Sequence, residues 1–424
     1  MVNKVDEREG AGFFLNVPQK LDNPFPDLKY FRENKPVFYY PPLDQWFVFG
    51  HDVVASLFSD PRLSADRMKG FVNAAPEEVR EGLRKVAPYL ERFVLMMDEP
   101  DHGRVRKFLH HGFNAAAIRG LRGQIQQIAD ELLDRVQDRG RLDASEDYGF
   151  LLPAYTLSDF LGFPTEDRHR VLQWSLDFIG FFNVVPITAE TTRPMVRSAT
   201  EMIDYTKALL AQRRANPHDD FLSTLANAWS EDVTEDEIIA NAMLLLLAGH
   251  VAPRNLIGNA AYLLLTNPDQ FAKLRTEPDL LRNTIEETLR YEPPVTLIPR
   301  IAIEDIELGS NVIRAGQVVQ LSIASANRDA AHFPNPDRFD ITRKPGNILS
   351  FGHGPHGCLG ALLAMEEAQI ALETLFRRMP GLRLDDSREI RWYRNAANRG
   401  PESLPLVFSE RPAASSLPHR GAWH

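Results

Sequence analysis

The sequence has a single cysteine, Cys358, among its 424 residues, and this scarcity excludes an internal disulfide bond. A chain without disulfides suits a reducing compartment, so we expect a cytoplasmic protein. Long apolar runs are also missing, because the longest, residues 243–248, is far too short to span a bilayer. Residues 1–15 carry five charged side chains between Lys4 and Glu9 and lack a continuous apolar region, so they predict neither a signal peptide nor a membrane anchor.

Basic residues are also fewer than acidic residues. The chain carries 48 Lys and Arg residues against 58 Asp and Glu residues, which gives a formal net charge of −10. Nucleic acids bind proteins through clustered basic side chains, so we expect no nucleic-acid partner. With 44% hydrophobic residues, the chain is long enough and apolar enough to bury a deep core.

Most of the chain has the apolar periodicity of amphipathic helices, and we expect a mainly α fold with a small β-rich region. Thr234 and Glu237 form a capping-box pattern before a long apolar run that ends near Leu265. We expect one domain over residues 1–411 and a disordered tail over residues 412–424. Further expected elements are helices over residues 125–136 and 202–213, strands over 295–303 and 317–323, and an irregular Pro-rich loop over 333–339.

The strongest motif surrounds the cysteine and reads Phe-Gly-His-Gly-Pro-His-Gly-Cys-Leu-Gly over residues 351–360, followed by an Ala- and Leu-rich helix. Glycines let the backbone approach a flat partner closely, and a helix N-terminus stabilises a thiolate. A lone cysteine is more often buried and inert, but the glycine pattern argues against that reading. The motif resembles the haem-binding loop of cytochromes P450 at every fixed position. The resemblance extends from about Pro36 to Phe408.

The resemblance implies a cytochrome P450 fold and a haem b cofactor whose iron is ligated by Cys358. Phe351, Gly352 and Gly360 would shape the loop around that ligand. Glu287 and Arg290 match the family's Glu-x-x-Arg pair, a buried structural clamp. The resemblance also implies four ligands of the haem propionates: His102, Arg106, Arg300 and His356.

The chain departs from the family pattern in its central helix, which normally carries an acid and an alcohol that organise water for proton delivery. Ala248, Gly249 and His250 are followed here by Val251 and Ala252 at the positions of the acid and the alcohol. Pro253 comes next and predicts a kink, because it cannot donate to the carbonyl of Gly249. Water held by that carbonyl and by His250, or the substrate itself, would have to supply protons. Histidine ordinarily titrates near neutrality and can both donate and accept, so His250 is a candidate relay. The alternative is that it takes no part in proton transfer.

The run Ala-Gly-His-Val-Ala-Pro resembles that of the indolocarbazole-forming P450s of staurosporine biosynthesis. This implies oxidative intramolecular aryl–aryl coupling of a bis-indole precursor, chromopyrrolic acid, in antibiotic-type secondary metabolism. Two alternatives remain: a conventional monooxygenase that hydroxylates an aromatic or polyketide-like compound with substrate-assisted proton delivery, and a non-catalytic haem-binding protein. As an enzyme of either kind, the protein would require O2. It would also require a ferredoxin with its reductase and NAD(P)H as the source of electrons, because the sequence contains no flavin or iron–sulfur motif. Arg104 and Lys107 are candidates for steering an acidic ferredoxin.

An aromatic-rich helix would suit a small, flat aromatic substrate through stacking, although such a stripe is more often core. A dicarboxylate would need a basic or amide partner for each carboxylate. The candidate substrate residues, by their positions in the family pattern, are Arg67, Phe178, Phe182, Asn183, Leu297, Ile298 and Asn398.

Overall fold

The computed structural model describes residues 7–10, 12–182, 188–344 and 346–409. The chain divides into two compact units. The first comprises Met1–Leu63, Ile125–Leu152 and Ala252–His424, and the second comprises Ser64–Gln124 and Pro153–Val251. The expectation of one domain over residues 1–411 stays a prediction, and residues 412–424 lie outside the described part of the chain.

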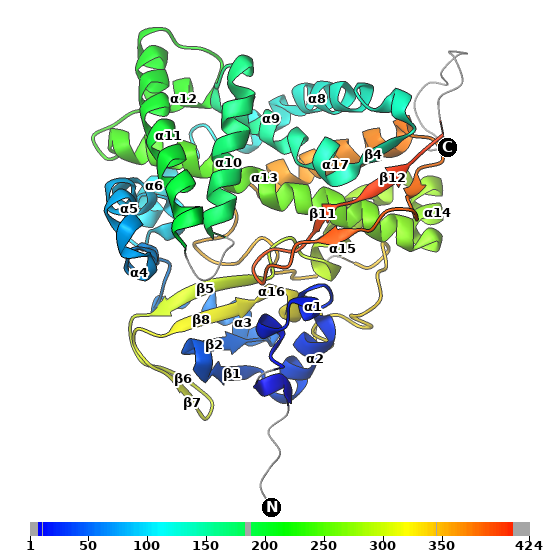
Figure 1. Ribbon diagram of the computed structural model, residues 1–424, viewed down its shortest axis with the longest axis horizontal. Helices are drawn as coiled ribbons and strands as arrows, with labels where there is room; N and C mark the ends of the chain where they lie inside the picture. Colours follow the sequence, from blue (N-terminus) through cyan, green and yellow to red (C-terminus); the bar gives the residue numbers. More distant parts are fainter. Residues whose placement is uncertain (1–6, 11, 183–187, 345, 410–424) are drawn as a thin grey trace, which may run out of the picture. The chain divides into compact units, whose positions relative to one another are not determined.

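A five-stranded sheet in the first unit brings together segments that are far apart in the sequence. Its order is β1-β2-β8-β5-β3, so the early strands β1 and β2 lie beside the late strands β8 and β5 (Figure 1). β2 runs parallel to β8, and the β1–β2 and β5–β8 pairs are antiparallel. The bounds are β1 (Val37–Tyr40), β2 (Gln45–Val48), β3 (Leu63–Ser64), β5 (Leu297–Ala302) and β8 (Val318–Ser322).

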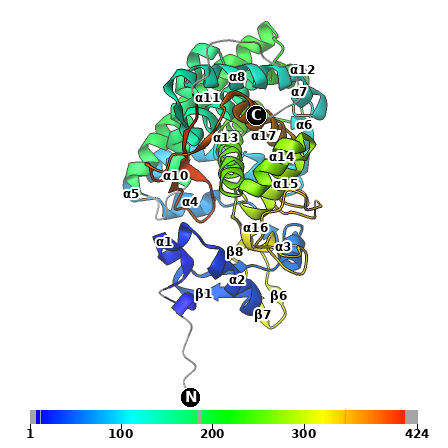
Figure 2. The same cartoon turned by 90° about the vertical axis from the view of Figure 1, so that its right-hand side faces the viewer.

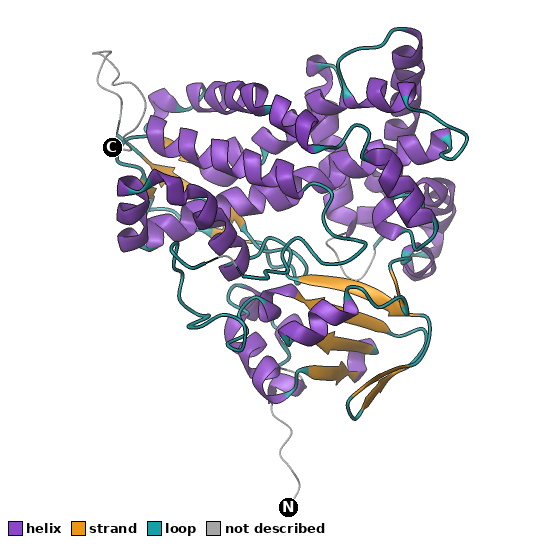
Figure 3. Ribbon diagram, turned by 180° about the vertical axis from the view of Figure 1, so that it is seen from behind, coloured by secondary structure: helices purple, strands orange, loops and turns teal. Residues whose placement is uncertain are grey.

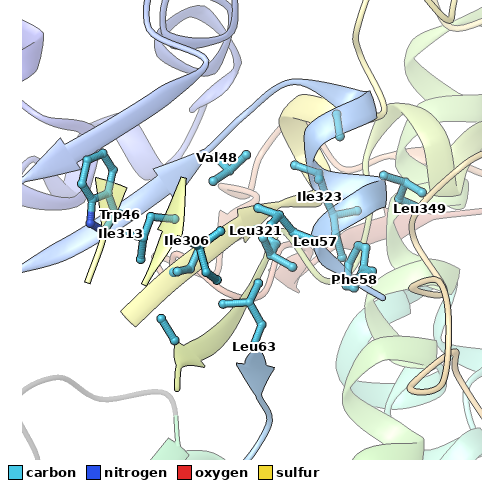
Figure 4. Packing of buried hydrophobic residues seen from close by; sticks show 14 residues of the cluster. Trp46, Val48, Leu57, Phe58, Leu63, Ile306, Ile313, Leu321, Ile323 and Leu349 are labelled. Atoms are coloured by element: carbon cyan, nitrogen blue, oxygen red, sulfur yellow. The ribbon is translucent and has the colours of Figure 1, made fainter. Parts of the chain in front are cut away.

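Buried aliphatic side chains fix this sheet against its neighbouring helices and the hairpin of β6 (Ile306–Leu308) and β7 (Asn311–Ile313). Val48 from β2, Leu321 from β8 and Leu57 from α3 (His51–Leu57) pack in one cluster (Figure 4). All three are at most 2% exposed. Burial of this kind contributes about 1.5–3 kcal/mol for each large side chain, so the cluster holds the register of the sheet.

Helices make up most of the remainder of the first unit, and α15 packs against α17 (Figure 2). Leu281, Ile285, Thr288 and Leu289 of α15 are buried at helical spacing, which places its apolar face inward. The helices are α1 (Pro18–Leu21), α2 (Phe25–Asn34), α3, α8 (Arg122–Asp134), α14 (Pro268–Thr276), α15 (Leu281–Tyr291), α16 (Ile323–Ala326) and α17 (Ala361–Arg378). The short strands are β4 (Arg141–Asp143), β9 (Arg383–Leu384), β10 (Arg391–Trp392), β11 (Pro401–Ser403) and β12 (Pro405–Val407).

The second unit is almost entirely helical. Val79, Leu83, Val86 and Leu90 of α5 are all buried, and their spacing gives this helix one apolar face, while α10 and α11 pack along one another. The helices are α4 (Met68–Ala74), α5 (Glu77–Leu90), α6 (Asp101–Leu109), α7 (Ala115–Gly120), α9 (Leu151–Leu161), α10 (Arg168–Phe182), α11 (Ala189–Ala215) and α12 (Phe221–Asn227).

The longest helix, α13 (Glu235–Thr266), contributes to both units. It begins with the predicted capping box, because the Thr234 N–H donates to Glu237 Oε2 at 2.7 Å and the Glu237 N–H donates to Thr234 Oγ1 at 3.2 Å. α13 is long and apolar enough to cross a membrane by composition alone, but 67% of its most apolar window is buried inside the protein. It therefore has the character of a core helix.

The structure confirms the predicted fold class, since helices dominate and the strands belong to the first unit apart from Ser64 of β3 (Figure 3). The predicted strands correspond to β5 and β8, the helix over residues 202–213 lies within α11, and residues 333–339 form an irregular loop. The kink expected at Pro253 does not interrupt α13, whose residues remain helical on both sides of it.

Candidate active site

Cys358 lies in a glycine-rich loop that leads into α17. The φ angle is +70° at both Gly352 and Gly354, a conformation that glycine adopts without the steric cost of a Cβ. A Cβ at Gly354 would also lie 2.3 Å from Ser59 Oγ. The N–H of Cys358 donates to the Phe351 carbonyl oxygen at 2.7 Å and closes the loop. The glycine pattern therefore encodes the backbone shape that presents the sulfur.

The Cys358 side chain is exposed, although cysteine is among the residue types most often buried. It stands two residues before Gly360, the N-cap of α17. The positive end of the helix dipole favours negative charge at this end, so the position suits a thiolate that ligates a metal.

One face of α13 is open in the middle of the helix. Ala248 is exposed, and Leu245, Gly249 and Ala252 are half-buried, whereas most residues on the other faces are buried. Their spacing of i, i+3, i+4 and i+7 places these four on one side. The open face carries small and apolar groups only and offers no acid and no alcohol.

Gly249 has a packing role that the sequence did not reveal. A Cβ at this position would lie 2.1 Å from Cδ1 of Leu157, a buried residue of α9. Glycine at position 249 therefore lets α9 approach α13 closely within the second unit. No sequence signal identifies Leu157, because it is one apolar residue among many in its helix.

His250 lies on the side of α13 away from the open face. At 100° per residue, it is rotated by roughly 150° from the middle of that face. The side chain is 1% exposed, and its Nδ1 lies 2.7 Å from the carbonyl oxygen of Leu246 one turn earlier. That carbonyl can only accept, so Nδ1 carries the proton. The relay role of His250 stays a prediction, and it requires water to connect the ring with the open face.

Glu287 and Arg290 form the predicted clamp on α15. Arg290 is 1% exposed, and it donates to the two carboxylate oxygens of Glu287 at 2.7 and 2.9 Å. Its remaining N–H groups donate to the carbonyl oxygens of Asn327 at 3.1 Å, Pro336 at 2.8 Å and Arg338 at 3.1 Å. The pair thus fastens the irregular loop over residues 327–338 to α15. Arg343, which the sequence analysis missed, donates to Glu287 at 3.2 Å.

The four predicted propionate ligands divide between the two units, and their convergence stays a prediction. In the second unit, His102 is 2% exposed and its Nδ1 lies 3.1 Å from Glu99 Oε1, while Arg106 is half-buried one turn later on α6. In the first unit, Arg300 is buried on β5 with Nη1 donating to the Pro299 carbonyl at 3.0 Å, and His356 is half-buried in the cysteine loop.

The aromatic side chains described on α10, the aromatic-rich helix predicted near the substrate, are largely core. Phe178 is 2% exposed, Trp174 donates to Glu201 at 3.1 Å, and the ring of Phe181 lies 5.9 Å from that of Phe71 on α4. Arg67 precedes α4 and is half-buried. Leu297 is buried and Ile298 is half-buried on β5. Asn398 forms an isolated antiparallel β-bridge with Val295. Phe182 ends α10, its side chain is not described, and Asn183 lies outside the described residues.

Arg104, one of the two candidates for steering ferredoxin, forms ion pairs within the second unit. It donates to Glu237 Oε1 at 2.6 Å and to Asp101 Oδ1 at 2.8 Å. These hydrogen bonds, that to Glu237 above all, raise the pKa of Arg104. Its charge is therefore neutralised within the second unit. Lys107 remains exposed.

The residues fit a haem. In the first unit, the exposed sulfur of Cys358 at a helix N-terminus suits an iron ligand, and Arg300 is a buried base that suits a propionate. The open face of α13, taken by itself, carries no acid and no alcohol. The fold and these parts define a haem-thiolate protein.

Comparisons with known proteins support the assignment to the haem-thiolate proteins. The sequence profile described as "Cytochrome P450" matches residues 169–380. Cytochrome P450 107B1 of Saccharopolyspora erythraea is 39% identical over 88% of this chain and 90% of its own length, and 6-deoxyerythronolide B hydroxylase of the same organism is 35% identical over 86% and 90%. The crystal structure of P450BioI in complex with hexadec-9Z-enoic acid-ligated acyl carrier protein superposes with a TM-score of 0.85 at 33% identity, covering 92% of this chain and 99% of that one.

The chain belongs to the cytochrome P450 family. It is an oxidoreductase with haem b as cofactor, and it depends on O2 and on electrons from a ferredoxin and its reductase.

Proposed function

We propose that this P450 couples the two indole rings of chromopyrrolic acid by an intramolecular aryl–aryl C–C bond, in cytoplasmic secondary metabolism that leads to an indolocarbazole. The coupling removes one hydrogen from each ring. Two electrons and two protons come from the substrate, two electrons come from NADPH through ferredoxin, and two protons come from solvent. One O2 is thereby reduced to two waters. Haem b, held through Cys358, supplies the redox centre for this chemistry.

The observation that carries the proposal is the composition of the open face of α13. Ala248, Gly249 and Ala252 line it with no acid or alcohol. A substrate that loses electrons from an electron-rich ring needs no oxygen atom inserted at a positioned C–H bond. Ala248, Gly249 and Ala252 leave room for a broad aromatic system, and the fourth residue of the face, Leu245, is apolar.

Oxygen activation still consumes protons, and the chain offers two routes for them. Pro253 has no N–H, so the carbonyl of Gly249 lacks its ordinary helical donor and is available to water. The substrate also brings its own carboxyl groups. Arg67, half-buried at the start of α4, is the basic side chain that we assign to one of these carboxylates.

The second candidate is a conventional monooxygenase that hydroxylates an aromatic or polyketide-like compound with protons delivered through the substrate. The names of the relatives favour it, since one of them is a 6-deoxyerythronolide B hydroxylase. In that reaction one oxygen atom enters the product and the other becomes water.

Isotope labelling separates the two reactions. The holoenzyme is supplied with ferredoxin, its reductase, NADPH, chromopyrrolic acid and 18O-labelled O2, and the products are analysed by mass spectrometry. Coupling gives a product that has lost two hydrogens, with or without carbon dioxide, and that contains no label. A product with one labelled oxygen would establish the monooxygenase instead. Absence of turnover with chromopyrrolic acid, under conditions in which another aromatic is oxidised, would refute the substrate.

The basic side chains that favour ferredoxin docking lie beside the cysteine loop. A surface cavity of about 420 Å³ in the first unit is lined by Phe351 and Leu362 together with Arg282, Arg343, Lys344, Glu286 and Glu287. Arg282 and Arg343 each donate to one of these carboxylates at 3.2 Å, so we assign the attraction of an acidic protein to the exposed Lys344. Lys344→Glu is therefore expected to raise the KM for ferredoxin with little change in substrate binding. An unchanged KM would exclude this surface.

A further inference from the structure

A second group of metal-ligand side chains lies in the first unit and has no part in the haem chemistry. His51 and Asp52 open α3, and His332 belongs to the loop after α16. One nitrogen of each histidine and one Asp52 oxygen lie within 4.8 Å of one another. His332 Nε2 is 2.8 Å from Asp52 Oδ1, and His51 Nδ1 is 3.8 Å from the same oxygen.

The hydrogen bond on the far side of the His51 ring determines which nitrogen is available. Nε2 lies 2.8 Å from the carbonyl oxygen of Asn347. A carbonyl can only accept, so Nε2 carries the proton and the neutral ring presents a lone pair at Nδ1. A carbonyl in this position is the usual outer-shell partner of a histidine that ligates a metal.

This lone pair is buried and faces another acceptor. His51 is 2% exposed, and Nδ1 has no hydrogen-bond partner among the residues that the structure describes. Asp52 Oδ1 is too distant for a hydrogen bond even if Nδ1 were protonated. Two acceptors pointed at the same space are stabilised by a cation placed between them.

From this arrangement we infer that His51, Asp52 and His332 form a binding site for a divalent transition metal such as Zn²⁺. Two imidazoles and one carboxylate, with water as fourth ligand, suit zinc and its neighbours in the first transition row. Calcium and magnesium prefer all-oxygen ligands and are disfavoured here.

Binding of zinc requires the exposed ligands to adjust. Ligand atoms around tetrahedral zinc are separated by roughly 3.3 Å, which lies between the two distances seen here. The rings of His51 and His332 are stacked with centroids 3.8 Å apart, so His332 must rotate for its lone pair to reach the metal. Solvent exposure leaves room for this rotation, because the side chains of Asp52 and His332 are 84% and 31% exposed.

The backbone around the group is fixed by one residue. Asp329 accepts from the His51 N–H through Oδ2 at 3.1 Å, and its carbonyl oxygen accepts from the His332 N–H at 3.1 Å. Asp329 therefore ties the two ligand-bearing segments together before any metal arrives. Such preorganisation lowers the cost of ordering the site.

Zinc binding to untagged holoprotein tests the inference without any measurement of turnover, so its outcome is independent of the proposed function. Isothermal titration with ZnCl2, checked by elemental analysis after dialysis, is expected to show one specific equivalent per chain. Asp52→Asn keeps the shape of an exposed side chain, and His332→Ala removes a half-exposed ligand. Each is expected to weaken zinc at least about tenfold.

The control is His169→Ala, which removes an exposed histidine from another surface and is expected to leave zinc affinity unchanged. The haem absorption spectrum of each variant reports whether it is folded. Equal affinity in wild type, Asp52→Asn and His332→Ala, or the absence of any specific equivalent in folded wild-type protein, would overturn the assignment.

Discussion

The clamp on α15 gives the sharpest test of the fold, through the substitution Arg290→Ala. Every N–H group of this guanidinium is engaged: two donate to Glu287, and the others reach three carbonyl oxygens of the loop over residues 327–338. The side chain is 1% exposed, so water does not replace these bonds unless the loop detaches.

The expected cost follows from what the substitution leaves behind. Removal of one partner from a buried ion pair costs about 3–5 kcal/mol, because the other charge stays buried. The three carbonyls lose their donors, at about 1 kcal/mol or more each where water cannot reach them. Arg343 offsets part of this, since it still donates to Glu287 at 3.2 Å. We expect a net loss on the order of 4 kcal/mol, a large share of the roughly 5–15 kcal/mol typical of folded proteins.

Urea denaturation of the holoprotein, followed by haem absorbance and far-ultraviolet circular dichroism, measures this loss. Arg290→Lys keeps the charge but not the planar set of donors, and it is expected to fall between Arg290→Ala and wild type. Arg282→Ala is the matched control, because it removes an exposed i,i+4 partner of Glu286 on the same helix and should cost at most about 1 kcal/mol. If Arg290→Ala were as stable as Arg282→Ala, the clamp would not hold the loop.

Three further substitutions test the haem ligand, a buried carboxyl and the proton supply. Cys358→Ala is expected to abolish the red-shifted absorption band of the ferrous carbon monoxide complex; survival of the band would mean that another group ligates the iron. Burial raises the pKa of Glu367 well above its ordinary 4.5. The folded state therefore keeps a proton that the unfolded state releases, and the free energy of unfolding falls as the pH rises from 4.5 through the raised pKa. Glu367→Gln should flatten that loss in denaturation series between about pH 5 and about pH 8, and an unchanged slope would show that Glu367 does not cause it. Ala252→Thr should not raise the rate of coupling; a large gain would show that the chain has no substitute for the missing alcohol.

The sequence predicted those parts of the fold in which local chemistry decides the backbone. The capping box of Thr234 and Glu237 marked the start of α13, and β-branched runs marked β5 and β8. The spacing of Glu287 and Arg290 predicted a pair on one helix face, but the three carbonyl acceptors of Arg290 come from a loop 37–48 residues later. Contacts of that kind depend on the tertiary fold, and no single-sequence pattern reports them.

The candidate site likewise combines features that the local sequence predicts with features that depend on the tertiary fold. The glycines around Cys358 predicted a tight loop, and the structure has two of them at positive φ. The sequence could not show which way α13 turns, so it could not show that Ala252 lies on the open face and His250 lies away from it. Nor could it pair His51 with His332, since these residues meet only after the chain has folded around Asp329.

Gly249 and Ala252 of the Ala-Gly-His-Val-Ala-Pro run have different surroundings, and the difference concerns the source of protons for the reaction. Gly249 faces the end of the Leu157 side chain, so a larger residue there would require that side chain to shift whatever the reaction. Ala252 is half-buried on the open face, and its Cβ is the only side-chain atom that it offers there. If the proposed coupling is correct, water at the Gly249 carbonyl or an acidic group on the substrate would supply the protons that the family usually takes from a side chain. Ala252→Thr, as described above, tests that consequence.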